Sequence, residues 1–138
     1  MLPFFVYGTL RPGEPNHDLF LRGRTRAEEP ARMRGMALYD GPGYPYAVEE
    51  IGGGGGDVSG ELVTARSESY DELLCTLDAL EEYAPGDPAN LYERVERAAI
   101  LDDGTAVRAW VYVAAPAVAA GLRARGKLIE GGDWRTRG

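Results

Sequence analysis

Apolar residues recur at helical spacing over residues 67–83, which predicts the one long helix of the chain. Successive side chains of an α-helix are about 100° apart, and on this scale the apolar residues form one stripe roughly 120° wide. The stripe consists of Tyr70, Leu73, Leu74, Leu77 and Leu80, whereas Asp71, Glu72, Asp78 and Glu82 lie outside it. Ser69 and Glu72 have the spacing of a capping box, so we expect them to stabilise the first turn.

Glu81 is the exception to this pattern, because it projects into the apolar stripe. It lies about 40° from Leu77 and about 20° from Leu74 in the same projection. A carboxylate that faces a core is costly unless it is paired, hydrogen-bonded or neutralised by a raised pKa. Such groups are candidates for general acid/base catalysis. The ordinary alternative is that Glu81 turns to water near the helix end, or pairs with an arginine.

The rest of the chain consists mainly of short apolar or alternating segments, which predict strands joined by turns. We expect strands at residues 3–7, 24–31, 34–39, 44–51, 58–65, 91–101 and 106–114. Pro45 makes one of them an edge or irregular strand, and Asp102-Asp103-Gly104 predicts a hairpin. Short helices are expected at residues 16–21, with Asn16 as N-cap, and at residues 117–125. A tail at residues 127–138 is expected to pack by Trp134.

These elements predict a single domain over residues 1–138. One main helix interrupts a series of strands that are joined largely by hairpins, which indicates an α+β fold with a sheet curled toward a barrel. Residues 52–56 are five consecutive glycines and are most simply a hairpin tip. A phosphate-binding loop of the Walker type would need Gly-Lys-Ser/Thr, but Asp57-Val58 follows the glycines, so they do not predict a nucleotide-binding site.

The net charge of −7 argues against nucleic acid and against an anionic membrane as partners. No stretch approaches about 18 consecutive apolar residues, and the first residues do not resemble a signal peptide. One cysteine, Cys75, permits no intrachain disulfide, which fits a reducing cytosol and a cytoplasmic protein. One cysteine and one histidine, His17, do not suffice for a common zinc site. Acidic neighbours disfavour Cys75 as a nucleophile.

A second candidate feature is the loop directly after the first strand. Gly8 lets the backbone turn sharply, so that successive N–H groups point the same way. A nest of this kind binds a carboxylate or an oxyanion. Taken alone, however, the Tyr-Gly-Thr-Leu segment at residues 7–10 is also what an ordinary strand-to-turn junction looks like.

The ordered set of motifs resembles the gamma-glutamylcyclotransferase-like superfamily. Tyr7-Gly8-Thr9-Leu10-Arg11, with Gly13 and Asn16-His17 after it, is similar to the opening signature of that superfamily. Further landmarks follow in the family's order at Gly35 through Tyr39, Gly43-Tyr44-Pro45, Gly60-Glu61-Leu62, Leu77-Asp78-Ala79-Leu80-Glu81, Tyr92 and Arg94, Trp110-Val111-Tyr112, and Gly131-Gly132-Asp133-Trp134. The resemblance therefore covers nearly the whole chain.

The resemblance implies a small mixed, mostly antiparallel β-barrel with one main helix and short flanking helices. It places the family's acidic residue at Glu81 and its substrate loop at Tyr7, Gly8, Thr9 and Leu10. The activity it implies is release of 5-oxoproline from γ-glutamyl compounds, with no cofactor and no metal. One departure is Glu82, because many members have glycine after the acidic residue. Glu82 projects away from Glu81 on the helix, so we expect it to be solvated.

In the implied reaction the substrate's α-amino group attacks the γ-carbonyl of the same molecule. Glu81 accepts a proton from that amino group and later passes it to the leaving amine. The loop N–H groups would hold either the α-carboxylate or the developing oxyanion. Tyr92 and Tyr112 are expected to donate to substrate oxygens, or else are ordinary sheet aromatics. Arg94 could pair with a carboxylate or form a surface salt bridge. Asn16 and His17 are expected to be a helix cap and a structural hydrogen-bonding residue.

Two other functions stay open at this point. One is a non-catalytic protein on the same fold that binds an amino acid or another small carboxylate. The other is an enzyme that removes a γ-glutamyl protecting group from a biosynthetic intermediate, with the same chemistry and a different leaving amine. The expected partner is a small γ-glutamyl molecule, and the chain is a monomer or a homodimer.

Overall fold

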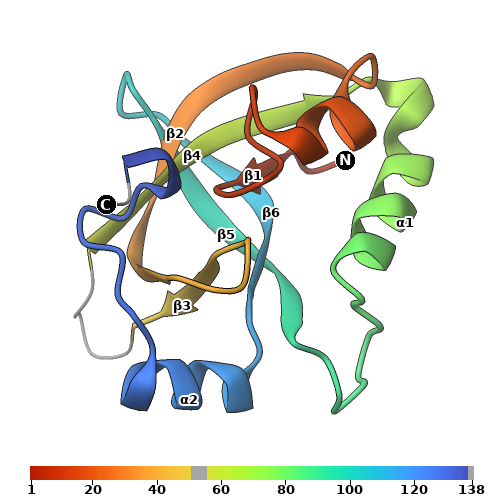
Figure 1. Cartoon of the computed structure of the whole chain (residues 1–138). Helices are drawn as coiled ribbons and strands as arrows, with labels where there is room; N and C mark the ends of the chain where they lie inside the picture. Colours follow the sequence, from red (N-terminus) through yellow and green to blue (C-terminus); the bar gives the residue numbers. More distant parts are fainter. Residues whose placement is uncertain (51–55, 137–138) are drawn as a thin grey trace.

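The strands of this protein form one curled sheet that closes into a barrel (Figure 1). The structure is a computed structural model that describes residues 1–50 and 56–136. The strands are β1 (Phe4–Val6), β2 (Thr25–Tyr39), β3 (Tyr46–Glu49), β4 (Gly56–Ala65), β5 (Tyr92–Leu101) and β6 (Ala106–Ala114). They lie in the order β3-β2-β4-β1-β6-β5, and β5 pairs with β2 again through Ala31↔Leu101. Five strands thus enclose the barrel, and β3 lies at the open edge of β2.

The pairing confirms a mixed, mostly antiparallel barrel. β1 is antiparallel to β4 and parallel to β6, with Phe4 opposite both Val63 and Trp110. β5 and β6 form the predicted hairpin, which is paired continuously from Tyr92↔Ala114 to Ile100↔Ala106. This hairpin brings residues that follow α1 beside the first strand of the chain.

β2 is one strand of 15 residues, where the pattern predicted two strands at 24–31 and 34–39. The alternation breaks because the register against β4 shifts between Arg34 and Met36. Gly35, between them, has φ +73°, a backbone conformation that residues other than glycine rarely adopt. The strand bends at this region instead of ending, and its later part pairs with β3 (Figure 1).

The predicted edge strand is confirmed in shortened form as β3, which follows Pro45 and pairs with β2. The five-glycine segment predicted as a hairpin tip falls mostly on residues 51–55, outside the described residues. Gly56 already belongs to β4.

The main helix, α1 (Tyr70–Leu80), is shorter than the predicted 67–83. A 3-10 turn, η2 (Ser67–Ser69), precedes it, and Ser69 makes no side-chain cap, so the capping-box prediction is wrong. The other helical segments are η1 (His17–Leu21), α2 (Pro116–Arg125) and η3 (Trp134–Thr136). Asn16 is helical in conformation and does not cap η1. In the part of the chain that the structure describes, no helix has the length and apolar character needed to cross a membrane.

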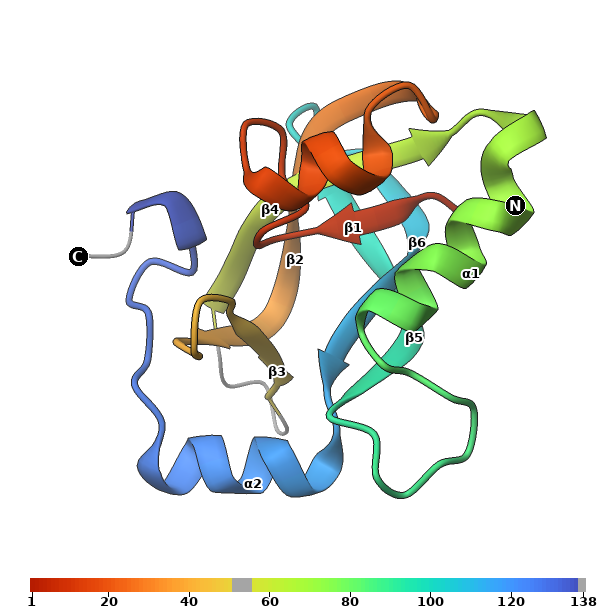
Figure 2. The same cartoon turned by 45° about the vertical axis from the view of Figure 1, so that its right-hand side comes forward.

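Two apolar clusters stabilise the fold. One fills the barrel with alternate side chains of the strands, such as Phe5, Leu62 and Val111. The predicted tail packs against this cluster through Trp134, which is almost completely buried. The other cluster lies between the barrel and α1, where Leu73 and Leu77 meet the opposite face of β1 and β6. Figure 2 shows α1 outside the barrel, alongside these strands. The end of α1 is thereby held next to the loop that follows β1.

Candidate active site

A cavity of about 320 Å³ opens where β1 and α1 end, beside the loop that precedes β3. Every residue proposed from the sequence as a site residue lines it, namely Tyr7, Gly8, Thr9, Leu10, Glu81, Tyr92 and Tyr112. These residues come from the loop after β1, the end of α1, and the two strands of the β5–β6 hairpin. The structure therefore brings the proposed set together, while the role of each member stays a prediction.

Glu81 is the first residue beyond α1, with its N–H bonded to the carbonyl of Leu77 at 3.0 Å. Its partly buried side chain lines the cavity. No other described residue forms an ion pair or hydrogen bond with the carboxylate. Burial raises the pKa of Glu81 from its ordinary value of 4.5 to about 7. The negative end of the α1 dipole acts in the same direction. The alternative of an arginine partner for Glu81 is thus not realised among the described residues.

Glu82 completes a Schellman motif at the end of the helix. Its N–H donates to the carbonyl of Ala79 at 3.1 Å, and the N–H of Tyr83 donates to the carbonyl of Asp78 at 2.8 Å. Glu82 has φ 53°, in the left-handed region, where glycine is the usual residue. Glu82 is exposed, as expected from the sequence, but it also lines the cavity. A glycine at this position would adopt this conformation without strain.

The loop after β1 is held by its own turn and by Asn16. The N–H of Arg11 donates to the carbonyl of Gly8 at 3.0 Å, and Asn16 donates its N–H and its side-chain amide to Thr9. A Cβ on Gly8 would lie 2.7 Å from the ring of Pro45, so the loop needs glycine at this close approach. Among the described residues no acceptor bonds the N–H groups of residues 8–10. These N–H groups are available to an anionic ligand.

Tyr7, Tyr92 and Tyr112, which line the cavity, are ordered by hydrogen bonds to the protein. The hydroxyl of Tyr7 donates to the carbonyl of Tyr112 at 2.6 Å, and that of Tyr92 donates to the carbonyl of Pro45 at 2.8 Å. Burial raises the pKa of Tyr7, Tyr92 and Tyr112, and the nearby charge of Glu81 raises each of them further. The hydroxyl protons of Tyr92 and Tyr112 are thus given to protein acceptors, and their oxygens can still accept a hydrogen bond.

Sequence reasoning missed the role of Asp78, one helical turn before Glu81. Asp78 accepts a hydrogen bond of 2.6 Å from the Tyr112 hydroxyl and an ion-pair hydrogen bond of 2.9 Å from Arg94. The Arg94 guanidinium also stacks on Trp110, with 4.4 Å to the ring centroid. Arg94 therefore pairs with a carboxylate of the protein and does not line the cavity. These contacts tie the end of α1, and with it Glu81, to the β5–β6 hairpin.

Some residues that line the cavity belong to motifs noted in the sequence but were not predicted to be site residues. Gly43, Tyr44 and Pro45 line the cavity from the loop before β3, and they were one of the ordered landmarks. Asn16 lines it as well, although only a helix cap was expected there. His17 contacts the side chain of Glu28 away from the cavity, which agrees with a structural hydrogen-bonding residue.

The family described as gamma-glutamyl cyclotransferase, AIG2-like, matches this chain over residues 4–136. The chain belongs to this family. A relative from Niallia circulans, named gamma-L-glutamyl-butirosin B gamma-glutamyl cyclotransferase, is 37% identical over 111 residues, which cover 79% of this chain and 64% of the relative. The chain thus spans less than two thirds of the length of that relative.

Solved structures of similar proteins have the same fold. The crystal structure of an AIG2-like protein from Mus musculus is 25% identical, with a TM-score of 0.64 over 85% of this chain and 81% of the mouse chain. An uncharacterized protein from Pyrococcus horikoshii is 26% identical, with a TM-score of 0.63 over 97% of this chain and 90% of that chain.

Proposed function

We propose that this protein is a γ-glutamyl cyclotransferase that releases 5-oxoproline from a γ-glutamyl amine or amino acid. The observation that carries the proposal is that the carboxylate of Glu81 shares one cavity with the N–H groups of residues 8–10, and that neither has a partner among the described residues. Membership of the family and the name of the Niallia relative support it. The cavity volume is at the lower end for ligand pockets, so it suits the γ-glutamyl group, with the leaving amine toward the opening.

Glu81 acts as the general base in the first step. It accepts a proton from the substrate's α-ammonium group, and the freed amine attacks the γ-carbonyl carbon. A pKa near 7 suits proton exchange at neutral pH, because the group can both take and return a proton. The reaction is intramolecular, so the cavity accelerates it mainly by folding the substrate into a near-attack conformation.

The loop N–H groups hold negative charge during the reaction. Among the described residues that line the cavity, none is Lys, Arg or His, so the backbone donors of residues 8–10 are the groups suited to an anion. They bind either the α-carboxylate or the oxyanion that forms on the γ-carbonyl oxygen. Glu81 then passes its proton to the leaving nitrogen. The bond from the γ-carbon to that nitrogen breaks as the oxyanion becomes a carbonyl again. The attacking nitrogen gives its second proton, through Glu81, to the departing amine, so the products are 5-oxoproline and the protonated amine.

The experiment is an assay of 5-oxoproline release from a panel of γ-glutamyl amino acids and γ-glutamyl amines. We expect Glu81→Gln to lower kcat by about 10²- to 10⁴-fold, the usual contribution of a general base. Glu72→Gln is the matched control, because Glu72 is an exposed carboxylate of α1 that does not line the cavity, and this variant should retain activity. Undiminished turnover by Glu81→Gln would rule out the proposed base. No product from any substrate, together with tight binding of a small carboxylate, would instead favour the non-catalytic binding protein.

A second candidate is removal of a γ-glutamyl protecting group from a larger amine. The name of the 37% identical relative, which specifies a γ-L-glutamyl derivative of butirosin B, favours this candidate. The chemistry at Glu81 is the same, and only the leaving amine differs. Comparison of kcat/KM between small γ-glutamyl amino acids and γ-glutamyl derivatives of larger amines separates the two. A strong preference for the amino acids would exclude the protecting-group function.

A further inference from the structure

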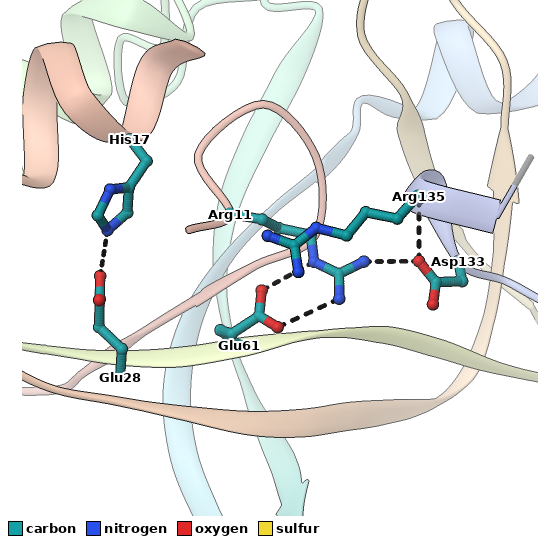
Figure 3. Close-up of polar contacts among 6 residues, drawn as sticks. All are labelled: Arg11, His17, Glu28, Glu61, Asp133 and Arg135. Carbon is teal, nitrogen blue, oxygen red and sulfur yellow. Dashed lines mark hydrogen bonds and ion pairs between the residues drawn. The ribbon is translucent and has the colours of Figure 1, made fainter. Parts of the chain in front are cut away.

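Arg11 is held between two carboxylates directly after the substrate loop (Figure 3). Its Nε and Nη2 donate to the two oxygens of Glu61 at 2.8 and 3.1 Å, and its Nη1 donates to Asp133 at 2.7 Å. Only 5% of Arg11 and 8% of Glu61 are exposed to solvent. We call these three residues the Arg11 cluster. None of them lines the cavity.

The Arg11 cluster is not suited to bind the substrate itself. Nε, Nη1 and Nη2 of the guanidinium all donate to carboxylates of the protein, and those carboxylates outnumber the one positive charge. A buried ion pair is also weak evidence for stability, because loss of hydration offsets much of its attraction. The bidentate pairing with Glu61 instead fixes the orientation of the Arg11 side chain.

The orientation of Arg11 determines that of the loop before it. The N–H of Arg11 closes the turn by donating to the carbonyl of Gly8, and the carbonyl of Arg11 accepts from the N–H of Glu14. A rotation of the Arg11 backbone would therefore rotate the N–H groups of residues 8–10 relative to the cavity. The side chain of Arg11 resists this rotation, because it is bonded to β4 through Glu61.

The third member, Asp133, belongs to a segment that is itself fixed to the barrel. The carbonyl of Gly132 accepts a hydrogen bond of 2.8 Å from the N–H of Ser59 in β4. A Cβ on Gly132 would lie 2.0 Å from the carbonyl oxygen of Asp57, so the two backbones are in close contact. The N–H of Arg135 also donates to Asp133, at 2.9 Å (Figure 3). Asp133 thus offers Arg11 a rigid acceptor.

We infer that Arg11, Glu61 and Asp133 are positioning residues, which hold the N–H groups of residues 8–10 in the direction needed for the substrate's anionic group. This inference rests on the proposed function, in which that loop binds the α-carboxylate or the oxyanion. On this inference Asp133, although it is 122 residues from Arg11 in the sequence, helps to hold the active-site loop in place.

The test compares Asp133→Asn and Arg11→Lys with a matched control, Arg97→Lys. Arg97 forms the same bidentate pair with Glu49, at 2.7 and 3.0 Å, and it does not line the cavity. We measure kcat, KM, the pH dependence of kcat/KM and the unfolding midpoint of each variant. The two cluster variants should lose about 10- to 100-fold in kcat/KM, as expected for a weakened hydrogen bond to a charged group. The midpoint of the pH dependence should stay that of the wild type, because Glu81 directly follows α1 and forms no hydrogen bond or ion pair with the Arg11 cluster among the described residues.

A second measurement is independent of turnover. The ¹H–¹⁵N signals of Gly8, Thr9 and Leu10 are followed in each variant, alone and during titration with 5-oxoproline. We expect these signals to move in Asp133→Asn, which should weaken 5-oxoproline binding, and to be unchanged in Arg97→Lys. An inactive wild type would refute the proposed function, while the amide signals would still report on the position of the loop. Unchanged amide signals in Asp133→Asn, or equal losses of kcat/KM in Arg97→Lys, would overturn the inference.

Discussion

Replacement of Glu81 by glutamine should make the folded protein more stable at neutral and higher pH. Burial raises the pKa of this carboxyl from 4.5 to about 7, so the folded chain binds the proton more tightly than the unfolded chain does. Its contribution to the free energy of unfolding is therefore fully present below about pH 4.5, and it is lost as the pH rises through about 7. Above that pH, the wild type retains a partly buried charge that Glu81→Gln lacks.

The size of the effect follows from the two pKa values. The difference from 4.5 to about 7 is worth up to about 3 kcal/mol, at about 1.4 kcal/mol for each tenfold change in proton affinity. The Glu81 side chain keeps some contact with solvent, which reduces this figure. We therefore expect Glu81→Gln to exceed the wild type by about 1–3 kcal/mol at pH values near 8, and to differ little from it at pH values near 4.

Urea unfolding of wild type, Glu81→Gln and Glu82→Gln at several pH values between these limits measures the effect. Glu82→Gln controls for loss of a negative charge at the end of α1, because Glu82 is exposed and adjacent in sequence to Glu81. The reasoning is refuted if the difference between wild type and Glu81→Gln does not change with pH. It is also refuted if Glu82→Gln gives the same pH dependence.

The remaining predictions concern the same cavity and its frame. The kcat/KM of the wild type should rise with pH to a plateau, with a midpoint near 7, because only the carboxylate of Glu81 accepts a proton; a flat profile would contradict this. Thermal unfolding should show Glu82→Gly to be more stable than Glu82→Ala by about 1 kcal/mol, since φ is 53° there; inside a helix the order is the reverse. Gly8→Ala should lower kcat/KM at least about tenfold, because its methyl group would meet Pro45 and displace the loop. Gly121→Ala, in α2 with ample space, should add about 0.5–1 kcal/mol to stability and leave kcat/KM unchanged.

The candidate site could be predicted from the sequence because its parts are local patterns. Gly8 follows a short apolar strand, and Glu81 breaks the polar spacing of an amphipathic helix. Both patterns belong to the ordered motifs of the family that the chain resembles, and this resemblance predicted that they form one site. The predicted helix ended at residue 83, three residues beyond the observed end of α1 at Leu80. Glu82 has a left-handed backbone conformation that ends the helix. A glycine at this position would have indicated that conformation in the sequence, whereas glutamate does not.

Contacts between distant parts of the chain could not be predicted. The bond from Tyr112 to Asp78 spans 34 residues, and that from Arg11 to Asp133 spans 122. Helical periodicity placed Asp78 only outside the apolar stripe, which is equally true of a solvated residue. The continuity of β2 was missed for a related reason, since a bulge at Gly35 reverses the alternation without ending the strand.

The ion pair between Arg11 and Asp133 also has a consequence for the synthesis of the protein. At about 5–20 residues per second, the 122 residues between them take about 6–24 s to translate. The substrate loop is thus made well before Asp133, which is one of its supports. β1 likewise waits for β6, its parallel neighbour in the closed barrel. A nascent chain therefore exposes an incomplete site for many seconds, and chains interrupted before residue 133 lack the acceptor that holds Arg11.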